Sequence, residues 1–382
     1  MPIIESIAVA AVKVPLDVPT SFATRTVTDR HYCLVRVRSR EGVEGIGFCY
    51  VGSAAGALVR LAVEQLLAPV LLGQESRRSE GLWAEMYREA LLQGRAGSVM
   101  RAVSILDTAL WDLNARSVGL PLYDYLGCVR RDAVPAYASG GYYVEGKTPQ
   151  HLGEEMAGFV EAGFRAVKMK TGRFAPAVEE ARVRAAREAI GPDVLLMLDV
   201  NNGWPDLPTA LQHVRRLEAY DPYWIEEPFS PDAIDLHARL AERTGVTIAT
   251  GEIEAGRWRF RELVEAGGAE ILQTDAAVCG GITEWRRIAA AADAHGVTVS
   301  PHWFHDLHVH LVAATPNARF VEFFPDAQVL NFRRLIDRQL EHRDGELLLP
   351  AGAGLGFGFD ADAVRRFGAG GDGWTVLGGR AA

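Results

Sequence analysis

Three apolar runs in the middle of the chain each end on a carboxylate. The runs read VLLMLD, PYWIE and VTIATGE, and they end at Asp199, Glu226 and Glu252, which are 27 and then 26 residues apart. A single acid after a strand often only caps a helix or pairs with an arginine. Three in consecutive units would repel one another unless a divalent cation lay between them. Oxygen ligands without Cys or His favour Mg²⁺ or Mn²⁺ over zinc.

Another run, FRAVKMK, places Lys168 and Lys170 two residues apart. Side chains at this spacing on a strand point to the same face, so two ammonium groups are aimed at one place. Taken alone, the pair suggests two lysines that extend from a sheet edge into water. Beside three carboxylates, the pair instead suggests the basic side of a common site.

Later runs add Asp275 in LQTDA, His302 in VSPHW and Glu322 in FVEFF. An Asp one unit away from a His can orient the imidazole and raise its basicity. The stretch HWFHDLHVHL also contains His305, His308 and His310, which invite a second metal site. Because these three follow a strand end, in an expected loop and helix, we predict no metal there.

The elements that must position these side chains form a repeating pattern. From about residue 133, eight short apolar runs alternate with amphipathic helical stretches, which predicts a parallel (β/α)8-type barrel. The carboxylates then lie at the C-terminal ends of strands, where barrel active sites are found. The runs are AVPAYASGG, FRAVKMK, VLLMLDVN, PYWIEEP, VTIATGE, EILQTDA, VTVSPHW and RFVEFF.

The flanking segments do not follow the barrel pattern. Residues 1–130 contain strands followed by helices, which predicts an α+β domain, with a mobile loop over the polar stretch from Pro19 to Arg30. Residues 131–330 are the predicted barrel. Residues 331–382 break the alternation and are expected to pack back on the first domain.

Composition limits the classes of partner. The 382 residues carry a formal charge of −9 without a basic block, so nucleic acid and anionic membranes are not expected partners. The four cysteines lack CxxC spacing, which argues against a disulfide framework and a thiolate zinc site. No apolar run approaches the roughly 18 residues of a membrane helix, and the N-terminus reads as a strand rather than a signal peptide. We therefore expect a cytoplasmic protein.

With these motifs, the chain resembles the enolase superfamily and, within it, the mandelate racemase group. The resemblance covers nearly the whole chain, and it implies a modified TIM barrel, (β/α)7β, with an α+β capping domain. The Lys-x-Lys motif on the second barrel strand corresponds to Lys168 and Lys170. The other positions implied are the ligands of one Mg²⁺ (Asp199, Glu226, Glu252), a His/Asp dyad (His302, Asp275), a substrate-carboxylate contact (Glu322) and a polar residue beside the metal (Asn201).

The resemblance also implies a chemistry. The substrate is a small carboxylate with an adjacent C–H, and Mg²⁺ stabilises the enediolate formed when that proton leaves. Lys170 and His302 would be the two bases, on opposite faces of the substrate, while Lys168 stays cationic and holds the carboxylate. A neighbouring cation and partial burial should lower the pKa of Lys170 towards that of a general base.

Several reactions fit two opposed bases. We favour dehydration of an acid sugar, an aldonate or aldarate, to a 2-keto-3-deoxy acid, because this outcome is the most frequent in the group. Racemisation or epimerisation of a 2-hydroxy acid and cycloisomerisation of a lactone are the alternatives on the same site. A Schiff-base aldolase that uses Lys170 and a non-catalytic barrel are the alternatives from other classes.

The capping-domain loops, at about residues 15–31 and 50–56, would set specificity. The stretch Thr20–Thr26 is rich in hydroxyl groups and has one cation, which suits a polyol or diacid. Arg25 and Arg30 are candidates for contact with a distal carboxylate, although both could be solvated loop charges. The identity of the acid sugar is not readable from the sequence, and a homo-oligomer is expected from the family alone.

Overall fold

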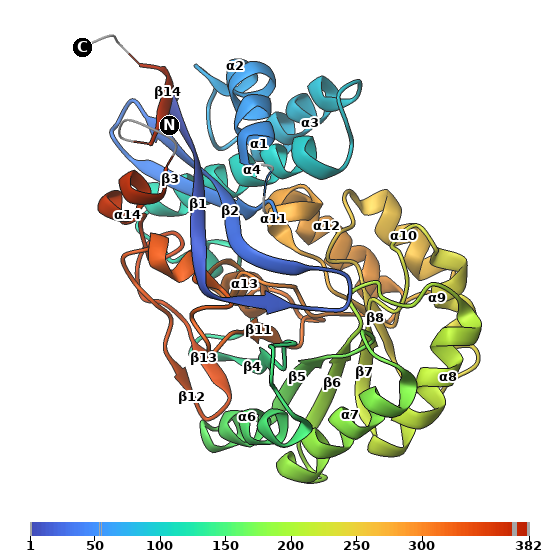
Figure 1. Cartoon of the computed structure of the whole chain (residues 1–382). Coiled ribbons are helices and arrows are strands. Elements are labelled where there is room, and N and C mark those ends of the chain that lie inside the picture. The colour runs from blue at the N-terminus through green and yellow to red at the C-terminus, as the bar shows by residue number, and fades with distance from the viewer. Residues whose placement is uncertain (1, 53, 55, 369–372, 380–382) are drawn as a thin grey trace.

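The computed structural model describes residues 2–52, 54, 56–368 and 373–379. It contains two sheets, one in the capping domain and one that forms the barrel (Figure 1). The cap sheet has the order β14-β1-β2-β3. Its strands are β1 (Ile4–Ser21), β2 (Thr26–Ser39), β3 (Glu44–Tyr50) and β14 (Thr375–Gly378). The cap helices are α1 (Gly56–Ala62), α2 (Ala68–Leu71), α3 (Ser79–Ala90), α4 (Gly97–Ser117) and α5 (Leu122–Tyr125), with a π-helical turn (Val63–Leu67) between α1 and α2.

The long β1–β2 hairpin differs from the sequence prediction. The polar stretch from Pro19 to Arg30, expected as a mobile loop, is mostly strand, because Thr20 pairs with Val27 and Ser21 with Thr26 after a register shift. Residues 22–25 alone form the connection. The hairpin end pairs with Tyr143 of the barrel domain through Ser21. Strand pairing therefore extends the cap sheet over the barrel mouth (Figure 1).

Helix α4 packs unusually close to strand β3. A Cβ atom added at Gly45 would lie 2.2 Å from the carbonyl oxygen of Ala109, and one at Gly47 would lie 1.9 Å from that of Ile105. Only a residue without a side chain allows this approach. The two glycines thus fix the position of α4, whose first residues face the barrel mouth.

The barrel has the eight strands expected from the sequence. Strands β4 to β10 pair in parallel with their sequence neighbours, and β11 pairs in parallel with β4. A bridge between Val299 and Ala318 links β10 to the segment before β11 and closes the ring. The strands are β4 (Ala133–Gly140), β5 (Ala166–Lys170), β6 (Leu195–Asp199), β7 (Pro222–Glu226), β8 (Ile248–Thr250), β9 (Ile271–Leu272), β10 (Thr298–Val299) and β11 (Val321–Phe323).

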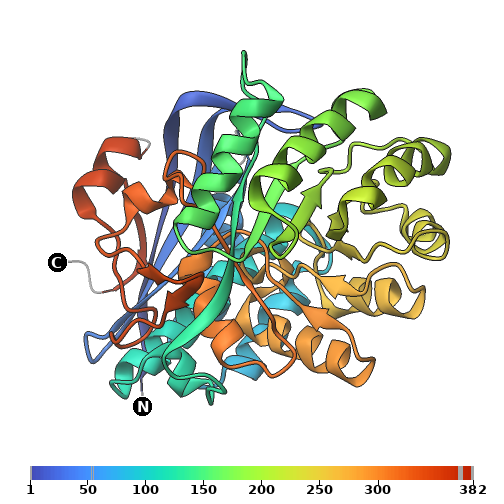
Figure 2. The same ribbon diagram turned by 90° about the horizontal axis from the view of Figure 1, so that it is seen from below.

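Helices follow seven of the eight strands, so the (β/α)7β architecture is confirmed. Figure 2 shows them arranged around the strands when the molecule is seen from below. The last of them, α13, is buried along its whole length, as is the short α11. The helices are α6 (Pro149–Glu161), α7 (Pro176–Ile190), α8 (Leu207–Leu217), α9 (Ile234–Ala241), α10 (Arg257–Glu265), α11 (Ala276–Cys279), α12 (Gly281–Ala294) and α13 (His305–Ala313), with 3-10 turns at Glu218–Tyr220 after α8 and Asn331–Leu335 after β11.

The segment after the barrel contacts both sheets. Strands β12 (His342–Arg343) and β13 (Glu346–Leu348) form a hairpin, and β13 pairs antiparallel with β4. Helix α14 (Ala361–Phe367) follows, and β14 then pairs with β1 in the cap. The domain boundaries at residues 130 and 330 stay predictions, since this segment belongs to both sheets.

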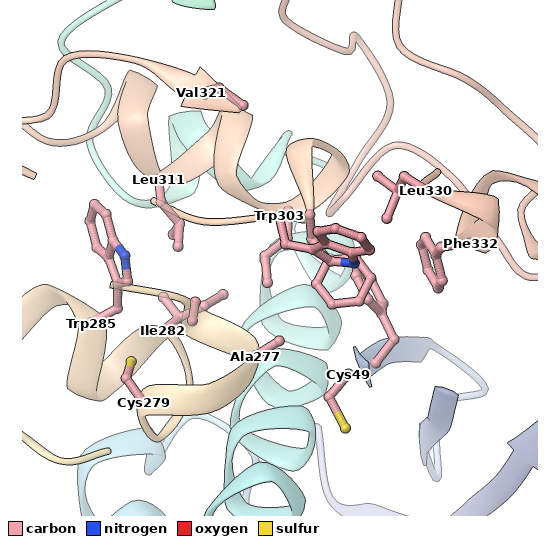
Figure 3. Close-up of a cluster of buried hydrophobic side chains, with 14 of the residues drawn as sticks. Cys49, Ala277, Cys279, Ile282, Trp285, Trp303, Leu311, Val321, Leu330 and Phe332 are labelled. Atoms are coloured by element: carbon pink, nitrogen blue, oxygen red, sulfur yellow. The ribbon is translucent and has the colours of Figure 1, made fainter. Parts of the chain in front are cut away.

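One hydrophobic core runs through the cap, the barrel and the C-terminal segment. Figure 3 shows Cys49 of β3, Trp285 of α12 and Phe332 of the C-terminal segment within one cluster of buried side chains. The cap is therefore packed on the barrel through apolar contacts rather than tethered by a linker. Within the described residues, no helix combines the length and the apolar sequence needed to cross a bilayer.

Candidate active site

The floor of the barrel mouth is built around Lys168. Its Nζ lies 2.7 Å and 2.9 Å from the two carboxylate oxygens of Glu226, and 2.8 Å from Glu322 Oε1. Burial lowers the pKa of Lys168, but Glu226 and Glu322 raise it by more, so the net pKa lies well above the ordinary value. Lys168 is therefore a cation, as the sequence argument expected.

Glu322 is also held from a second side. Its Oε2 accepts a hydrogen bond of 2.8 Å from the backbone N–H of Trp303. Burial raises the pKa of Glu322, whereas Lys168 and His302 lower it by more, to about 2. Glu322 is an anion fixed beside Lys168.

Lys170 contacts Asp199, its neighbour in register on the next strand. Asp199 also accepts hydrogen bonds from Asn201, of 2.9 Å from the backbone N–H to Oδ1 and of 3.2 Å from Nδ2 to Oδ2. Burial raises the pKa of Asp199, but Lys170 and Lys168 lower it by more. These contacts bring three of the predicted residues together at the ends of β5 and β6.

The expected fall in the pKa of Lys170 is wrong for this structure. Burial does lower that pKa, and Lys168 lowers it further, but the adjacent Asp199 carboxylate, together with Tyr142 and Glu226, raises it by more. The sequence argument counted the neighbouring cation and omitted the ion pair, because the register between β5 and β6 was not known. As described, Lys170 holds its proton.

The end of β5 is positioned from behind by Arg182 of α7. Its guanidinium donates hydrogen bonds to the carbonyl oxygens of Lys170, at 2.9 Å, and Gly141, at 3.1 Å. It also forms an ion pair of 2.7 Å with Glu179. Glu179 in turn accepts a hydrogen bond of 2.6 Å from the hydroxyl of Tyr143. This buried network fixes the strand end that carries Lys170.

His302 lies on the other side of the mouth, between two carboxylates. Its Nδ1 is 3.1 Å from Asp275 Oδ2, and its Nε2 is 3.4 Å from Glu252 Oε1. Burial lowers the pKa of His302, but Glu252 and the hydrogen bond with Asp275 raise it to about 9. The backbone N–H of Ala277 donates to Asp275 Oδ1 at 2.8 Å, which fixes the carboxylate for the imidazole.

A cavity of about 340 Å³ opens between the cap and the barrel mouth. Lys170 and His302 both line it, whereas Lys168, Asp199, Glu226 and Glu322 lie beneath its surface. Arg25 lies exposed at its rim, 5.7 Å from the Phe22 ring. The lining also includes Thr24, Arg30, Tyr50, Ser98, Arg101, Tyr142, Asn201, Asn202, Glu227, Glu252, Asp275 and Trp303.

Sequence reasoning missed several residues of this lining. Asn202, Glu227 and Trp303 have positive φ angles of 62°, 45° and 72°, as does Asn201 at 46°. These left-handed residues lie one to four residues after the strand ends, in the loops that line the cavity. Such conformations in non-glycine residues gather at functional sites. No sequence signal reveals a left-handed Glu or Trp. For Glu227, the second acid in WIEEP was the one available hint.

The three other histidines do not gather at a site. His305 and His308 are buried, and burial lowers their pKa values to about 3 and about 4. His308 Nε2 accepts a hydrogen bond of 3.1 Å from the backbone N–H of Ala276, and His310 Nε2 lies 3.2 Å from the carbonyl oxygen of Leu355. They pack α13 into its surroundings as neutral rings.

Comparison with known proteins identifies the family of the chain. The domain described as "Enolase C-terminal domain-like" matches residues 151–363, and the "Mandelate racemase / muconate lactonizing enzyme, N-terminal domain" matches residues 4–127. The chain belongs to the enolase superfamily, in its mandelate racemase group. The family predicted from the motifs is thereby confirmed.

Enolase-superfamily proteins similar to this chain include acid-sugar dehydratases and a lactone cycloisomerase. L-talarate/galactarate dehydratase of Salmonella typhimurium is 33% identical over 98% of this chain and 91% of its own length. Arabinonate dehydratase of Saccharolobus solfataricus is 34% identical, over 84% and 86%. D-galactarolactone cycloisomerase of Agrobacterium fabrum is 32% identical, over 92% and 95%. Dehydratases and a cycloisomerase thus occur at nearly equal similarity.

Solved enolase-superfamily structures share the whole fold. The crystal structure of the Salmonella typhimurium dehydratase has a TM-score of 0.90 at 31% identity, and it covers 99% of this chain and 94% of that chain. L-talarate dehydratase from Polaromonas sp. JS666, solved with Mg and L-glucarate, has a TM-score of 0.88 at 30% identity, covering 100% of both chains. Members of this superfamily use Mg²⁺.

The carboxylates here have the chemistry of a Mg²⁺ site. Asp199 and Glu226 lie side by side in register, and Glu252 Oε2 is buried without a hydrogen-bond partner among the described residues. Burial and the neighbouring acid Glu227 raise the pKa of Glu252 well above its ordinary value, as expected for crowded carboxylates without a cation.

The same acids are turned towards lysines in this structure. Asp199 contacts Lys170, and Glu226 contacts Lys168. Across the described part of the chain, no three His, Cys, Asp or Glu residues are arranged around one metal position. The donor set therefore fits Mg²⁺ by residue type and location. The assignment of Asp199, Glu226 and Glu252 as its ligands stays a prediction.

Proposed function

We propose that this enolase-superfamily protein removes the proton α to the carboxylate of an acid sugar and expels water to give a 2-keto-3-deoxy acid. The observation that carries the proposal is the position of Lys170 and His302, which both line the cavity. They come from β5 and β10, which are three places apart around the eight-stranded barrel by way of β4 and β11. Two proton-transfer groups therefore approach a bound molecule from nearly opposite sides.

In this proposal, the residues of the site have separate roles in binding the substrate and transferring protons. Lys168 and Glu322, with Asn201, orient the substrate carboxylate above the floor of the site. Mg²⁺ held by Asp199, Glu226 and Glu252 would supply positive charge that makes both the α-proton and the Lys170 ammonium more acidic. Lys170 takes the proton from C2. His302, protonated because its pKa is about 9, gives a proton to the 3-hydroxyl group as the C3–O bond breaks.

Closure by the cap supports this chemistry. The hairpin residues 22–25 and the first turn of α4 cover the cavity, which limits the access of water to the reacting carbons. Electrostatic interactions are stronger in such an enclosed site than in bulk water. Arg25 at the rim contributes to substrate binding in this proposal.

The direct test is to incubate the protein with Mg²⁺ and a library of aldonates and aldarates and to assay 2-keto acids. Formation of a 2-keto-3-deoxy acid, lost in Lys170→Ala and His302→Asn, is the expected result. Inversion or α-deuterium exchange without a keto acid would instead assign a racemase or epimerase. Consumption of a lactone would assign a cycloisomerase.

Two controls address the other classes of protein. Borohydride trapping of substrate on Lys170 would indicate a Schiff-base aldolase. Unchanged activity in both Lys170→Ala and His302→Asn would indicate that Lys170 and His302 are not catalytic. We further propose a cytoplasmic homo-oligomer without nucleic-acid or membrane partners, whose oligomeric state sedimentation velocity would measure.

A further inference from the structure

Arg30 is a buried guanidinium without an ionic partner. The residue is 2% exposed, and its Nε is enclosed by protein without a hydrogen bond. Within the described residues, the guanidinium forms no ion pair and no hydrogen bond. A buried charge is costly unless it is paired. Arg30 therefore stands out from the ion-pair networks in the rest of the protein.

Arg182 is a buried arginine with a structural role, and its contacts can be compared with those of Arg30. It is 7% exposed, and it is paired with Glu179 and bonded to two carbonyl oxygens. Arg30 instead contacts ring faces, with its guanidinium carbon 4.5 Å from the Trp303 ring centre and 5.2 Å from that of Tyr50. Cation–π contacts leave the hydrogen-bonding edge of a guanidinium free.

The side chain lines the cavity on its cap side. Three acids line the same cavity, and each is already engaged on the barrel side. Asp275 and Glu252 contact His302, and Glu227 accepts a hydrogen bond of 3.1 Å from Asn202. The sequence left open a solvated loop charge at Arg30, but the residue is buried in β2. An anion that pairs with the Arg30 guanidinium must therefore be part of a bound ligand.

The distance between Arg30 and His302 fits a ligand with a six-carbon chain. The Trp303 ring lies 4.5 Å from the guanidinium carbon of Arg30 and 5.5 Å from the His302 ring, so Arg30 is within about 10 Å of His302. With C–C bonds of about 1.5 Å, an extended six-carbon diacid spans roughly 6 Å between its carboxyl carbons. With its reacting carbons beside His302, such a diacid can therefore reach Arg30 with its distal carboxylate.

We propose that Arg30 binds the second carboxylate of the substrate and makes the enzyme selective for aldarates over aldonates. The inference rests on the proposed acid-sugar dehydratase function and names the substrate class of that site. Arg30 is suited to this role because a guanidinium can bind a carboxylate through two parallel hydrogen bonds. Neighbouring Arg101 already donates to the carbonyl oxygen of Tyr50 at 2.8 Å, which leaves Arg30 as the unpaired buried cation of this wall.

The test compares a six-carbon aldarate with the aldonate of the same configuration, both with Mg²⁺ present. The wild-type enzyme should prefer the aldarate in kcat/KM by at least tenfold. Arg30→Met should lower kcat/KM about 100-fold for the aldarate and less than about 3-fold for the aldonate. Arg30→Lys keeps the positive charge but loses the two parallel N–H donors. Its kcat/KM for the aldarate should therefore lie between those of the wild type and Arg30→Met. The fold-changes follow from the strength of a charge-assisted pair.

Arg36→Met is the matched control. Arg36 lies on the same strand, 4.1 Å from the Trp374 ring, outside the cavity lining. Its loss removes an arginine–ring contact and should change neither substrate by more than about 3-fold. Melting temperatures of all variants report folding, and Arg30→Lys keeps the comparison possible if Arg30→Met does not fold.

Binding without turnover separates this inference from the proposed reaction. In a Lys170→Ala background, calorimetry should show weaker aldarate binding when Arg30→Met is added, and little change for the aldonate. Equal losses for both acids, or a wild-type enzyme that dehydrates only aldonates, would overturn the role of Arg30. If aldarate binding depends on Arg30 but no keto acid forms, the role of Arg30 in binding is supported and the proposed dehydration is overturned.

Discussion

Lys168 and Glu322 form an ion pair of 2.8 Å across the barrel mouth. The two residues come from β5 and β11, which flank β4, so one contact joins the second barrel strand to the last. Glu226 holds the same ammonium from the other side, and Asp199 Oδ2 lies 3.8 Å from it. Among the described residues, Lys168 therefore has three carboxylate partners, whereas Lys170 is paired with Asp199. The two lysines of one strand face are therefore placed for different roles.

Lys168→Ala and Lys170→Ala should have different effects. Lys168→Ala leaves Glu226 and Glu322 buried without their cation, so stability should fall by about 3–5 kcal/mol and substrate binding should weaken along with the rate. Lys170→Ala should keep substrate binding but abolish deuterium exchange of the α-proton on its face. Calorimetric melting and NMR of α-deuterium exchange measure these effects.

Lys147→Ala is the control for this pair. Lys147 forms an ion pair with Glu155 in which both side chains are partly exposed, and such pairs contribute about 1 kcal/mol or less. Its loss should leave both the melting temperature and exchange nearly unchanged. Exchange that persists in Lys170→Ala on the face opposite His302 would contradict the assignment of Lys170 as base.

Glu252→Gln should weaken Mg²⁺ binding by tenfold or more in the absence of substrate. The substitution removes an anionic oxygen that lies buried without a hydrogen-bond partner among the described residues, and Mg²⁺ prefers carboxylate oxygens. Titration calorimetry measures the affinity, and Mg²⁺ should raise the melting temperature of the wild type more than that of the variant.

Glu254→Gln provides the comparison for Glu252. Glu254 is also buried, but it contacts Arg259, at 3.2 Å, instead of lining the cavity. Its substitution should leave Mg²⁺ affinity within about threefold. Equal loss of affinity in the two variants would show that Glu252 is not a ligand.

The barrel was readable from the sequence because its signals are local. Each strand is a short apolar run, and Asp199, Glu226 and His302 follow such runs at the same end. Parallel strands in a barrel bring those ends together, so periodicity alone places these residues near one another. The family motifs then gave the fold and the reaction class.

The remaining features depend on contacts between distant segments. The end of the β1–β2 hairpin was expected as a mobile loop, because its polar, Thr-rich residues lack the alternation of an amphipathic strand and pair with each other over the barrel. The raised pKa of Lys170 comes from its register with Asp199. The turn that brings Trp303 against Arg30 needs a left-handed backbone, which the identity of a tryptophan does not reveal.

Asp107→Asn should change how stability depends on pH. Asp107 of α4 accepts hydrogen bonds from Thr283 of α12, of 2.8 Å from N–H and 2.7 Å from the hydroxyl. Burial raises the pKa of Asp107 to about 7. Between about pH 4, the ordinary carboxyl pKa, and pH 7 the folded protein therefore holds a proton that the unfolded chain has lost. This contribution to stability is complete below pH 4 and is lost as the pH rises through 7.

The asparagine variant cannot lose that stabilisation, so its melting temperature relative to wild type should rise by several degrees between pH 5 and pH 8. Calorimetry across this range gives the difference. Asp360→Asn changes an exposed helix cap that both residue types serve well, and it should give a constant offset. A constant offset for Asp107→Asn as well would mean that its carboxyl does not titrate in this range.

Gly47→Ala tests the close packing of α4 on β3. The new Cβ would lie 1.9 Å from the carbonyl oxygen of Ile105 and 2.8 Å from its carbonyl carbon, so the helix must move. Stability should fall by more than about 3 kcal/mol, as for other overpacked cores. Because Ser98 and Arg101 of the same helix line the cavity, KM should also rise.

Gly158→Ala in α6 is the opposite case, since a Cβ there meets no atom within 4 Å. Replacing a helical glycine in open space should stabilise the protein by up to about 1 kcal/mol and leave KM unchanged. Calorimetric melting and steady-state kinetics compare the two variants. If Gly47→Ala melted and bound substrate like the wild type, α4 would not be held at the distance from β3 that positions the cap side of the cavity.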